Sequence, residues 1–428
     1  MMEPSRRSDI EPFYVMEVMR AAEQRELGGG EVLHLEVGQP STGAPDGALK
    51  AVEEALRAGP LGYTGAAGTP ELRERISRWY RQRHDLNIDP DRIVVTTGAS
   101  GSCVLAFLAA FDVGDRVGLL EPGYPCYRND LQAFGADVVT IPVGHETSFR
   151  PTIDQLQATL PLAGLVLASP SNPTGTVLPP DLLRSVVDWA RDNDVVLIVD
   201  EIYHGITYDV ECPSALSYSN DLMVFNSFSK YFSMTGWRLG WIVAPPVMAA
   251  AIEKLAQSLT IAAPTVSQVA ALAAFECTHE LDGNVARYRA NREVVVEGLT
   301  RAGITEIAPA DGAFYVWADV SRLVSLVGSS SQDLCRLWLD ELGIAATPGV
   351  DFDQLRGHDF VRFSYAGSTP DLAEAMARLT RWVDQAWGGD RRGGPAEDRG
   401  RERGPGQGTD GARGWDGGQG RRPLDEGR

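Results

Sequence analysis

Between Arg92 and Ser229 the chain alternates between short apolar runs and longer segments in which apolar residues recur with helical spacing. The apolar runs are Arg92–Thr97, Arg116–Glu121, Gly164–Pro170, Val195–Glu201 and Leu222–Ser229, and the helical patterns are Ser102–Phe111, Tyr127–Gly135 and Pro180–Asn193. Buried parallel strands form continuous apolar runs, and a helical crossover joins each to the next. The pattern predicts an α/β fold with a mostly parallel sheet that binds ligands at the carboxyl ends of its strands.

A different pattern follows this alternating region. A helical stretch from about Ala249 to Arg301 precedes two further apolar strands, Ala313–Val320 and Phe360–Ala366, and helices are expected around residues 334–342 and 371–387. Near the N-terminus, Leu33–Pro40 is typical of a short strand that runs into a loop. We therefore expect an N-terminal arm (1–43) packing on a small α+β domain (286–387), with a large cofactor domain (44–285) between them.

The last segment, residues 388–428, has almost no apolar residues to bury and is rich in glycine and in charges of both signs. Its nine arginines are interspersed with eight acidic residues, so it lacks the uniform positive charge of a nucleic-acid-binding tail. We expect a disordered, solvated tail.

Composition narrows the class of function. The formal net charge of −19 argues against nucleic acid and anionic membranes as partners, and no stretch approaches the roughly 20 apolar residues of a membrane span. The five cysteines are scattered and odd in number, and the six histidines show no metal-binding spacing. We expect a protein of the cytoplasm with reduced cysteines, no metal centre and a small-molecule substrate.

Lysine is unusually scarce, because only three of the 39 basic residues are lysines. Lys50 and Lys254 lie in amphipathic helical patterns, where a lysine normally extends into water. Lys230 instead follows an apolar strand, in a loop dense in hydroxyl groups with Arg238 eight residues further on. An amine that reacts near pH 7 needs desolvating or cationic surroundings, so Lys230 is the candidate nucleophile.

Two segments carry groups suited to a phosphate. Gly98, Ala99 and Ser100 stand between a predicted strand and a helix, where free backbone N–H groups attract an anion. The second segment, Ser227–Gly240, resembles the cofactor-lysine signature of the class I and II aminotransferases of fold type I, through Ser227, Ser229, Lys230, Thr235, Gly236, Arg238 and Gly240. The resemblance extends from about Gly38 to Trp387. It implies an aspartate-aminotransferase-like fold, pyridoxal 5'-phosphate bound to Lys230 as a Schiff base, and phosphate contacts from Ser227, Ser229 and Arg238.

The resemblance assigns further roles residue by residue. Asp200, at the end of a buried strand where a carboxylate needs a cation or a cap, matches the aspartate that keeps the cofactor's pyridine nitrogen protonated. Tyr203 and Asn172 match residues that bond the ring oxygen, and Asn172 also lies in a turn sequence. Tyr124 matches the aromatic residue stacked on the ring, although a packed turn residue would also suit its place beside proline.

The resemblance also assigns residues that would contact the substrate and a partner subunit. Gly38 and Arg362 match the groups that bind the substrate α-carboxylate. Tyr63 matches a tyrosine that reaches the phosphate of the neighbouring subunit, which implies a homodimer with shared active sites. The region where dicarboxylate-specific relatives supply a second arginine, residues 261–268, contains none. We therefore expect a neutral or aromatic amino donor and an α-keto acid acceptor.

Other uses of the same cofactor stay open at this point. A β-lyase, a cyclopropane-forming synthase, a decarboxylase or an oxidase of the same fold would differ only in the fate of the carbanion at Cα. A non-catalytic ligand-binding regulator would need a basic helix-turn-helix before Gly38, and the N-terminal segment shows none. The identities of donor and acceptor are not determined by the sequence.

Overall fold

The computed structural model describes residues 3–327 and 330–387. The chain groups into two units, Met1–Gln385 and Ala386–Arg428, and the first unit contains the sheets of the described chain. The predicted tail, residues 388–428, lies outside the described residues.

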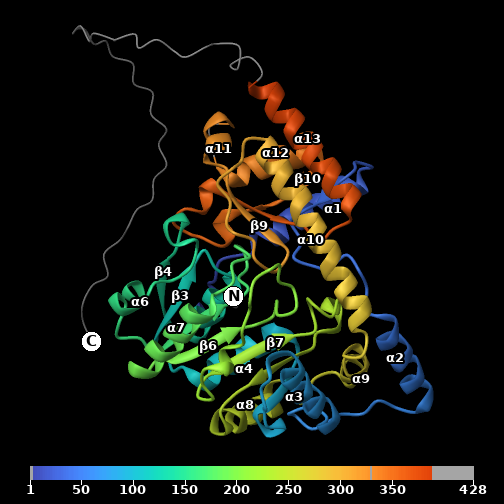
Figure 1. Cartoon of the computed structure of the whole chain (residues 1–428), viewed down its shortest axis with the longest axis vertical. Helices are drawn as coiled ribbons and strands as arrows, with labels where there is room; N and C mark the ends of the chain where they lie inside the picture. The colour runs from blue at the N-terminus through green and yellow to red at the C-terminus, as the bar shows by residue number, and fades with distance from the viewer. Residues whose placement is uncertain (1–2, 328–329, 388–428) are drawn as a thin grey trace. The chain divides into compact units, whose positions relative to one another are not determined.

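A seven-stranded sheet forms the centre of the fold (Figure 1). Its strands lie in the order β2 (Ile93–Thr96), β8 (Gly240–Val243), β7 (Met223–Ser227), β6 (Val196–Asp200), β5 (Gly164–Ala168), β3 (Arg116–Glu121) and β4 (Asp137–Pro142). As far as the chain is described, every strand pairing in this sheet is parallel except the two that β8 forms, with β2 and with β7. The mostly parallel α/β sheet is therefore confirmed, and the five predicted strands are β2, β3, β5, β6 and β7.

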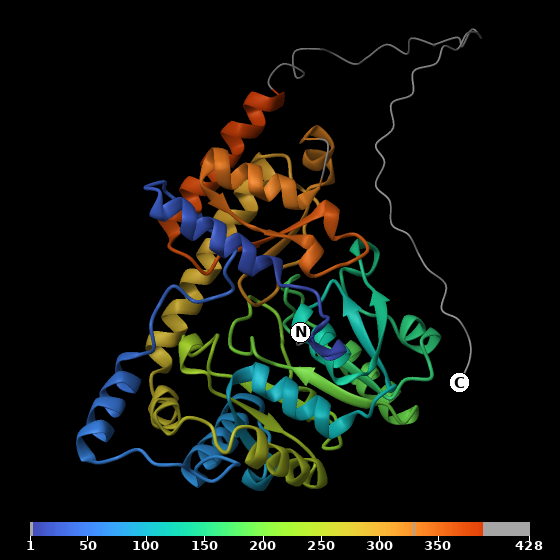
Figure 2. The same ribbon diagram turned by 180° about the vertical axis from the view of Figure 1, so that it is seen from behind.

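Helices lie on both faces of this sheet (Figures 1 and 2). The α-helices of the described chain are α1 (Tyr14–Leu27), α2 (Asp46–Ala58), α3 (Pro70–His84), α4 (Gly98–Ala110), α5 (Pro125–Phe134), α6 (Ile153–Ala158), α7 (Pro180–Asp192), α8 (Pro246–Leu259), α9 (Thr265–Ala274), α10 (Thr278–Arg301), α11 (Ser321–Val327), α12 (Ser331–Leu342) and α13 (Thr369–Trp387). The predicted helical stretch from about Ala249 to Arg301 thus consists of α8, α9 and α10. Short 3-10 turns occur at Arg6–Ser8, Pro90–Arg92, His145–Thr147, Ala215–Ser217, Thr235–Trp237, Gly349–Asp351 (η6) and Gly357–Asp359 (η7).

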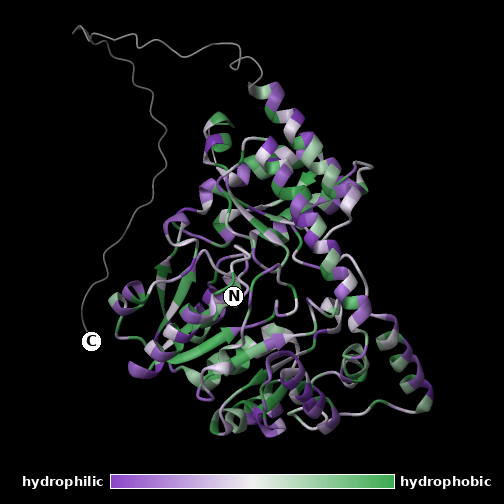
Figure 3. Cartoon of the chain, in the orientation of Figure 1, coloured by the Kyte–Doolittle hydropathy of each residue, from purple (hydrophilic) through white to green (hydrophobic). Residues whose placement is uncertain are grey.

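The main core lies between the sheet and its helices. Val94, Val117, Val166, Ile198 and Phe225, from five strands of the sheet, pack in one cluster with apolar residues of α4, α5 and α8. Figure 3 shows the strands in green, the colour of hydrophobic residues, and many outer helices with alternating purple and green. No helix in the described part of the chain is both long and apolar enough to cross a lipid bilayer.

Two smaller sheets complete the fold. Strands β11 (Thr347–Pro348), β12 (Phe360–Ser364) and β9 (Tyr315–Asp319) form an antiparallel sheet, and β1 (Leu33–His34) pairs in parallel with β10 (Ile344–Ala345). Helix α1 contacts β10, β11 and η6, and Figure 2 shows it in blue beside the orange C-terminal elements. These contacts support our proposal that residues 1–43 form an arm on a small domain (286–387), apart from a large domain (44–285).

Candidate active site

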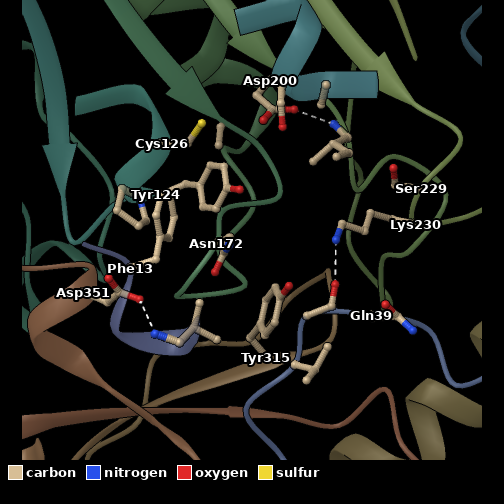
Figure 4. A pocket seen from close by; sticks show the side chains of 18 of the residues that line it. Phe13, Gln39, Tyr124, Cys126, Asn172, Asp200, Ser229, Lys230, Tyr315 and Asp351 are labelled. Carbon is tan, nitrogen blue, oxygen red and sulfur yellow. Dashed lines mark hydrogen bonds between the residues drawn. The ribbon is translucent and has the colours of Figure 1, made fainter. Parts of the chain in front are cut away.

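A cavity of about 560 Å³ opens at the carboxyl ends of β5, β6 and β7 (Figure 4). Ala168 and Asp200 line it from the strand ends, and Ser229 and Lys230 follow β7. Residues of α1, of the loop after β1 and of β12 line the opposite side. This is the edge at which parallel α/β sheets place their ligands.

Lys230 projects into this cavity from the loop after β7. Its side chain is partly buried, and Nζ donates a hydrogen bond to the carbonyl oxygen of Gly38 at 2.6 Å. Burial, followed by the positive charges of Arg362 and Arg238, lowers the pKa of Lys230 to about 8. A substantial fraction of the amine is therefore neutral and nucleophilic near neutral pH.

This lowered pKa predicts a distinctive reactivity. In the unliganded protein, acylation of Lys230 by acetic anhydride should accelerate as the pH rises through about 8, because only the deprotonated amine attacks. The exposed Lys50 on α2 and Lys254 on α8 provide internal references. Competitive labelling followed by peptide mass spectrometry measures all three profiles in one sample. A Lys230 profile that coincides with both references would contradict the effect of its surroundings.

Asp200 lies at the end of β6 and is almost fully buried. Its carboxylate accepts hydrogen bonds from the hydroxyl of Tyr127 and, at 2.8 Å, from the backbone N–H of Ile202. Burial nevertheless raises the pKa of Asp200 to about 7. Within residues 3–327 and 330–387, no lysine, arginine or histidine forms an ion pair with it. A cation delivered by a ligand would offset the cost of this buried charge.

One end of the cavity lies at the N-terminus of α4. Ala99, Ser100, Ser229 and Arg238 line it. Gly98 has a φ of +76°, and a Cβ there would stand only 2.7 Å from Arg238 Nη2, so glycine permits both the turn and the close approach of the guanidinium. The helix N-terminus, the hydroxyls and Arg238 together suit a phosphate.

Ser227 differs from its neighbours, because it does not line the cavity. Its hydroxyl donates to Ser229 Oγ at 2.8 Å and to the carbonyl of Leu239 at 3.0 Å. It therefore orients Ser229 and ties β7 to the segment that carries Arg238.

A second cationic group, Arg362, lies on β12 and is 4% exposed. It donates to Asn172 Oδ1 at 3.0 Å, to the carbonyl of Glu36 at 2.5 Å and to Thr347 Oγ1 at 3.2 Å. Its Nε has no hydrogen-bond partner in the described chain although it is buried. Since a buried donor without a partner is costly, this arginine is suited to an incoming carboxylate.

Four tyrosines surround the centre of the cavity. Tyr203 and Tyr315 join their hydroxyls at 2.7 Å, and the ring of Tyr124 meets that of Tyr127 edge-on at 5.4 Å between centroids. Gly38 is required beside Tyr315, because a Cβ there would lie 2.1 Å from its hydroxyl oxygen. The predicted residues Gly38, Tyr124, Asn172 and Tyr203 all line this part of the cavity.

Tyr63 lies elsewhere, outside the cavity of its own chain, with 85% of its surface exposed. Its contact with a neighbouring subunit stays a prediction. The five cysteines are unpaired, and Cys103 and Cys126 contribute to the cavity lining.

Sequence reasoning missed several residues of the site. Tyr127, Tyr315, Phe352 and Asp351 line the cavity, as do four residues from the start of α1: Phe13, Val15, Met16 and Met19. One signal was available for Tyr127, because it stands one helical turn after Tyr124 and so shares its face of α5. The others are brought to the site by contacts between distant segments.

Comparisons with known proteins agree with this geometry. The family description "aminotransferase class I and II" matches residues 30–379. Among curated proteins, the chain is 48% identical to a valine–pyruvate aminotransferase of Mycobacterium tuberculosis, covering 88% of this chain and 97% of that protein, and 31% identical to an aspartate/prephenate aminotransferase of Thermus thermophilus, covering 88% and 97%. A crystal structure of an aminotransferase from Mycobacterium tuberculosis superposes with a TM-score of 0.87 at 47% identity, covering 90% of this chain and all of that one.

Proposed function

The chain belongs to the class I and II aminotransferases and is a transferase enzyme, and from this premise we propose that it uses pyridoxal 5'-phosphate bound at Lys230 to transfer the amino group of a neutral amino acid to an α-keto acid. The observation that carries the proposal is one cavity in which Lys230, Asp200, Arg238 and Arg362 face a common space. The geometry provides an anion site at each end with an activated amine between them.

The residues fit this cofactor group by group. Arg238, Ser229 and the N-terminus of α4 would hold its phosphate, and the unpaired, buried carboxylate of Asp200 would bind its protonated pyridine nitrogen. Tyr124 would stack on the ring, and Asn172 and Tyr203 would bond its oxygen. When bound, pyridoxal phosphate supplies an electron sink for the negative charge left at the substrate's Cα.

The protein's own groups have separate tasks in the reaction. Arg362 would bind the substrate α-carboxylate and so fix the direction of the Cα–H bond. The amine of Lys230, whose pKa is lowered to about 8, would accept the Cα proton and later return one. Asp200 would hold a proton on the ring nitrogen throughout. Tyr203 and Tyr315, joined by their hydroxyls, would keep the wall between Lys230 and Arg362 rigid.

The cavity wall away from Lys230 supports a neutral substrate side chain. Phe13, Val15, Met16, Met19 and Phe352 make it apolar. The cationic side chains that line the cavity within the described chain are Lys230, Arg238 and Arg362, and each already has a task. The 48% identical relative is named for valine and pyruvate, which also supports an aliphatic donor.

The substrate prediction follows from this wall. Valine or another neutral aliphatic amino acid should give a kcat/KM about 100-fold or more above that of aspartate, because a side-chain carboxylate would be desolvated without a cation. A panel of first half-reactions, followed by the change in visible absorbance of the bound cofactor, measures this ratio. Quantifying keto acid against released ammonia or alkene tests transamination in the same samples. Aspartate as the best donor would contradict the neutral pocket.

The proposal also includes a homodimeric assembly and a cytoplasmic location. The exposed side chains of Leu49 and Leu56 on α2, together with Tyr63 and Ile261, support a homodimer in which Tyr63 reaches the neighbouring cavity. The five unpaired cysteines support a reducing compartment, the cytoplasm.

A further inference from the structure

We propose that Asp351 is a positioning residue, which fixes the start of α1 over the cavity and thereby sets the preference for branched aliphatic over smaller side chains. This inference rests on the proposed aminotransferase function and adds a determinant of its substrate class. Asp351 is the last residue of η6, which packs against β12, the strand of Arg362. Through Asp351 this turn contacts α1, the helix that contributes to the apolar wall.

Helix α1 has no side-chain cap of its own. Its N-cap residue is Phe13, which offers no hydrogen-bonding side chain. The carboxylate of Asp351, which lies 336 residues further along the chain than Val15, accepts the N–H groups of Tyr14 at 3.2 Å and Val15 at 3.1 Å. Figure 4 draws one of these two hydrogen bonds at the labelled Asp351. A carboxylate at a helix N-terminus satisfies free donors and interacts favourably with the helix dipole.

Asp351 itself is held in place and shielded. It is 3% exposed, and burial raises its pKa, while the two N–H groups and the charges of Arg362 and Arg128 oppose that rise. Phe352, the next residue, lies beneath the guanidinium of Arg362 with 4.7 Å from Cζ to the ring centroid. The same short segment therefore supports both the carboxylate-binding arginine and the helix.

The rest of α1 does not explain why its first turn stays at the cavity. Ala22 is its only buried residue, and it packs in a small cluster with Leu339 and Ala345. The partly buried Val18, which follows the first turn, packs against the same cluster. Arg25, in the C-terminal half of the helix, donates to the carbonyls of Glu31 and Asp340. At the other end, Met16 and Met19 are 55% and 37% exposed.

Near the first turn, two further contacts accompany Asp351. Asn129 donates to the carbonyl of Glu11 at 3.0 Å, and the ring of Phe13 lies 6.3 Å from that of Tyr124. Neither contact satisfies the N–H groups of the helix. Asp351 is therefore the group that fixes the orientation of the helix axis at this end, and with it the positions of Val15, Met16 and Met19.

The first test measures hydrogen exchange of residues 13–19 in the cofactor-loaded enzyme. Asp351→Ala should accelerate exchange there by roughly tenfold, as expected for the loss of a helix cap, and Asp351→Asn should do so by less, because its amide oxygen can still accept. Glu17→Ala, which removes an exposed acid from the same turn, is the matched control and should change exchange much less, because the charge of Glu17 is screened by water. Peptides of β6 and β7 report whether the fold is intact. Unchanged exchange in both Asp351 variants would overturn the proposal.

The second test compares donors. In the proposed binding mode the branched side chain of valine would reach the apolar wall and the methyl group of alanine would not. Asp351→Ala should therefore lower kcat/KM about tenfold for valine, mainly through KM, and much less for alanine. Asp351→Asn should restore part of the wild-type ratio of kcat/KM for valine to kcat/KM for alanine. Equal losses for both donors would assign Asp351 a merely structural role and overturn the inference. If the wild-type enzyme did not transaminate neutral donors, the proposed function would be wrong. The hydrogen-exchange experiment would still show whether Asp351 fixes the start of α1.

Discussion

Replacing Lys230 with alanine should lower transamination by at least about 10⁴-fold and abolish covalent attachment of the cofactor. The side chain is the only amine that lines the cavity in the described chain, and its lowered pKa lets it act as nucleophile and as base. The melting temperature should change by no more than about 3 °C, because the substitution removes one hydrogen bond, to Gly38, from a cleft that the sheet already forms. Activity assays, visible spectra and thermal melts measure the three effects.

Lys254→Ala provides the matched control for this variant. Lys254 is exposed on α8 and should be replaceable without a change in activity, spectrum or melting temperature. Retention of the visible cofactor band in Lys230→Ala, or its loss in Lys254→Ala, would show that the amine has been assigned to the wrong residue.

Asp200→Ala should lower kcat by about 10³-fold while the enzyme still binds its cofactor. In the transition state for removal of the Cα proton, the ring nitrogen of the cofactor has to keep its positive charge. The negative charge of Asp200 therefore stabilises this transition state more than the ground state. The phosphate end of the cavity, at Arg238 and the start of α4, does not involve Asp200 and should keep the cofactor bound. Single-turnover kinetics together with cofactor titration separate the two effects.

Tyr127→Phe provides the comparison for Asp200. It removes the hydroxyl that donates to the carboxylate but leaves the carboxylate itself. A loss of roughly 10- to 100-fold is expected, as for a single hydrogen bond to a charged group, which is less than the loss expected for Asp200→Ala. A near-normal kcat in Asp200→Ala would contradict the electrostatic role of this residue.

Much of the fold could be predicted because its strands are buried on both faces and therefore appear as continuous apolar runs. The two missed strands of the central sheet show the limit. In β4, at the edge of the sheet, only Ile141 is fully buried, and β8 is paired antiparallel between β2 and β7. The residues of β4 are therefore not a fully buried run. The residues of β8 are all buried, but β8 follows β7 without an intervening α-helix and so does not continue the alternation of strand and helix.

The residues of the site also divide into those that the local sequence reveals and those that it does not. Lys230, Arg238 and Ser229 belong to one short segment, so local sequence reveals them. The pKa of Lys230 depends most on burial and then on Arg362, a residue 132 positions away, whereas the sequence pointed to Arg238 alone. Local sequence shows neither of these influences. Helix α1 was missed for a related reason, since its N-terminal cap is supplied by Asp351.

The substrate wall is the part of the site that depends most on such distant contacts. Phe13, Val15, Met16 and Met19 come from α1, and Phe352 comes from the segment after η6. The absence of arginine from residues 261–268 indicated a neutral substrate, but the apolar residues that would meet its side chain appear only when the N-terminal helix is placed. This explains why the sequence indicated the chemistry more sharply than the donor.

The central claim, that Lys230 holds the cofactor of an aminotransferase, is tested most directly by borohydride reduction of the cofactor-loaded enzyme followed by peptide mapping. Reduction makes the bond between amine and cofactor permanent, so mass spectrometry locates it at a single residue. We expect one pyridoxyl phosphate group per chain, on Lys230. A stable adduct on Lys50 or Lys254, or no adduct in an enzyme that turns over amino acids, would contradict this claim.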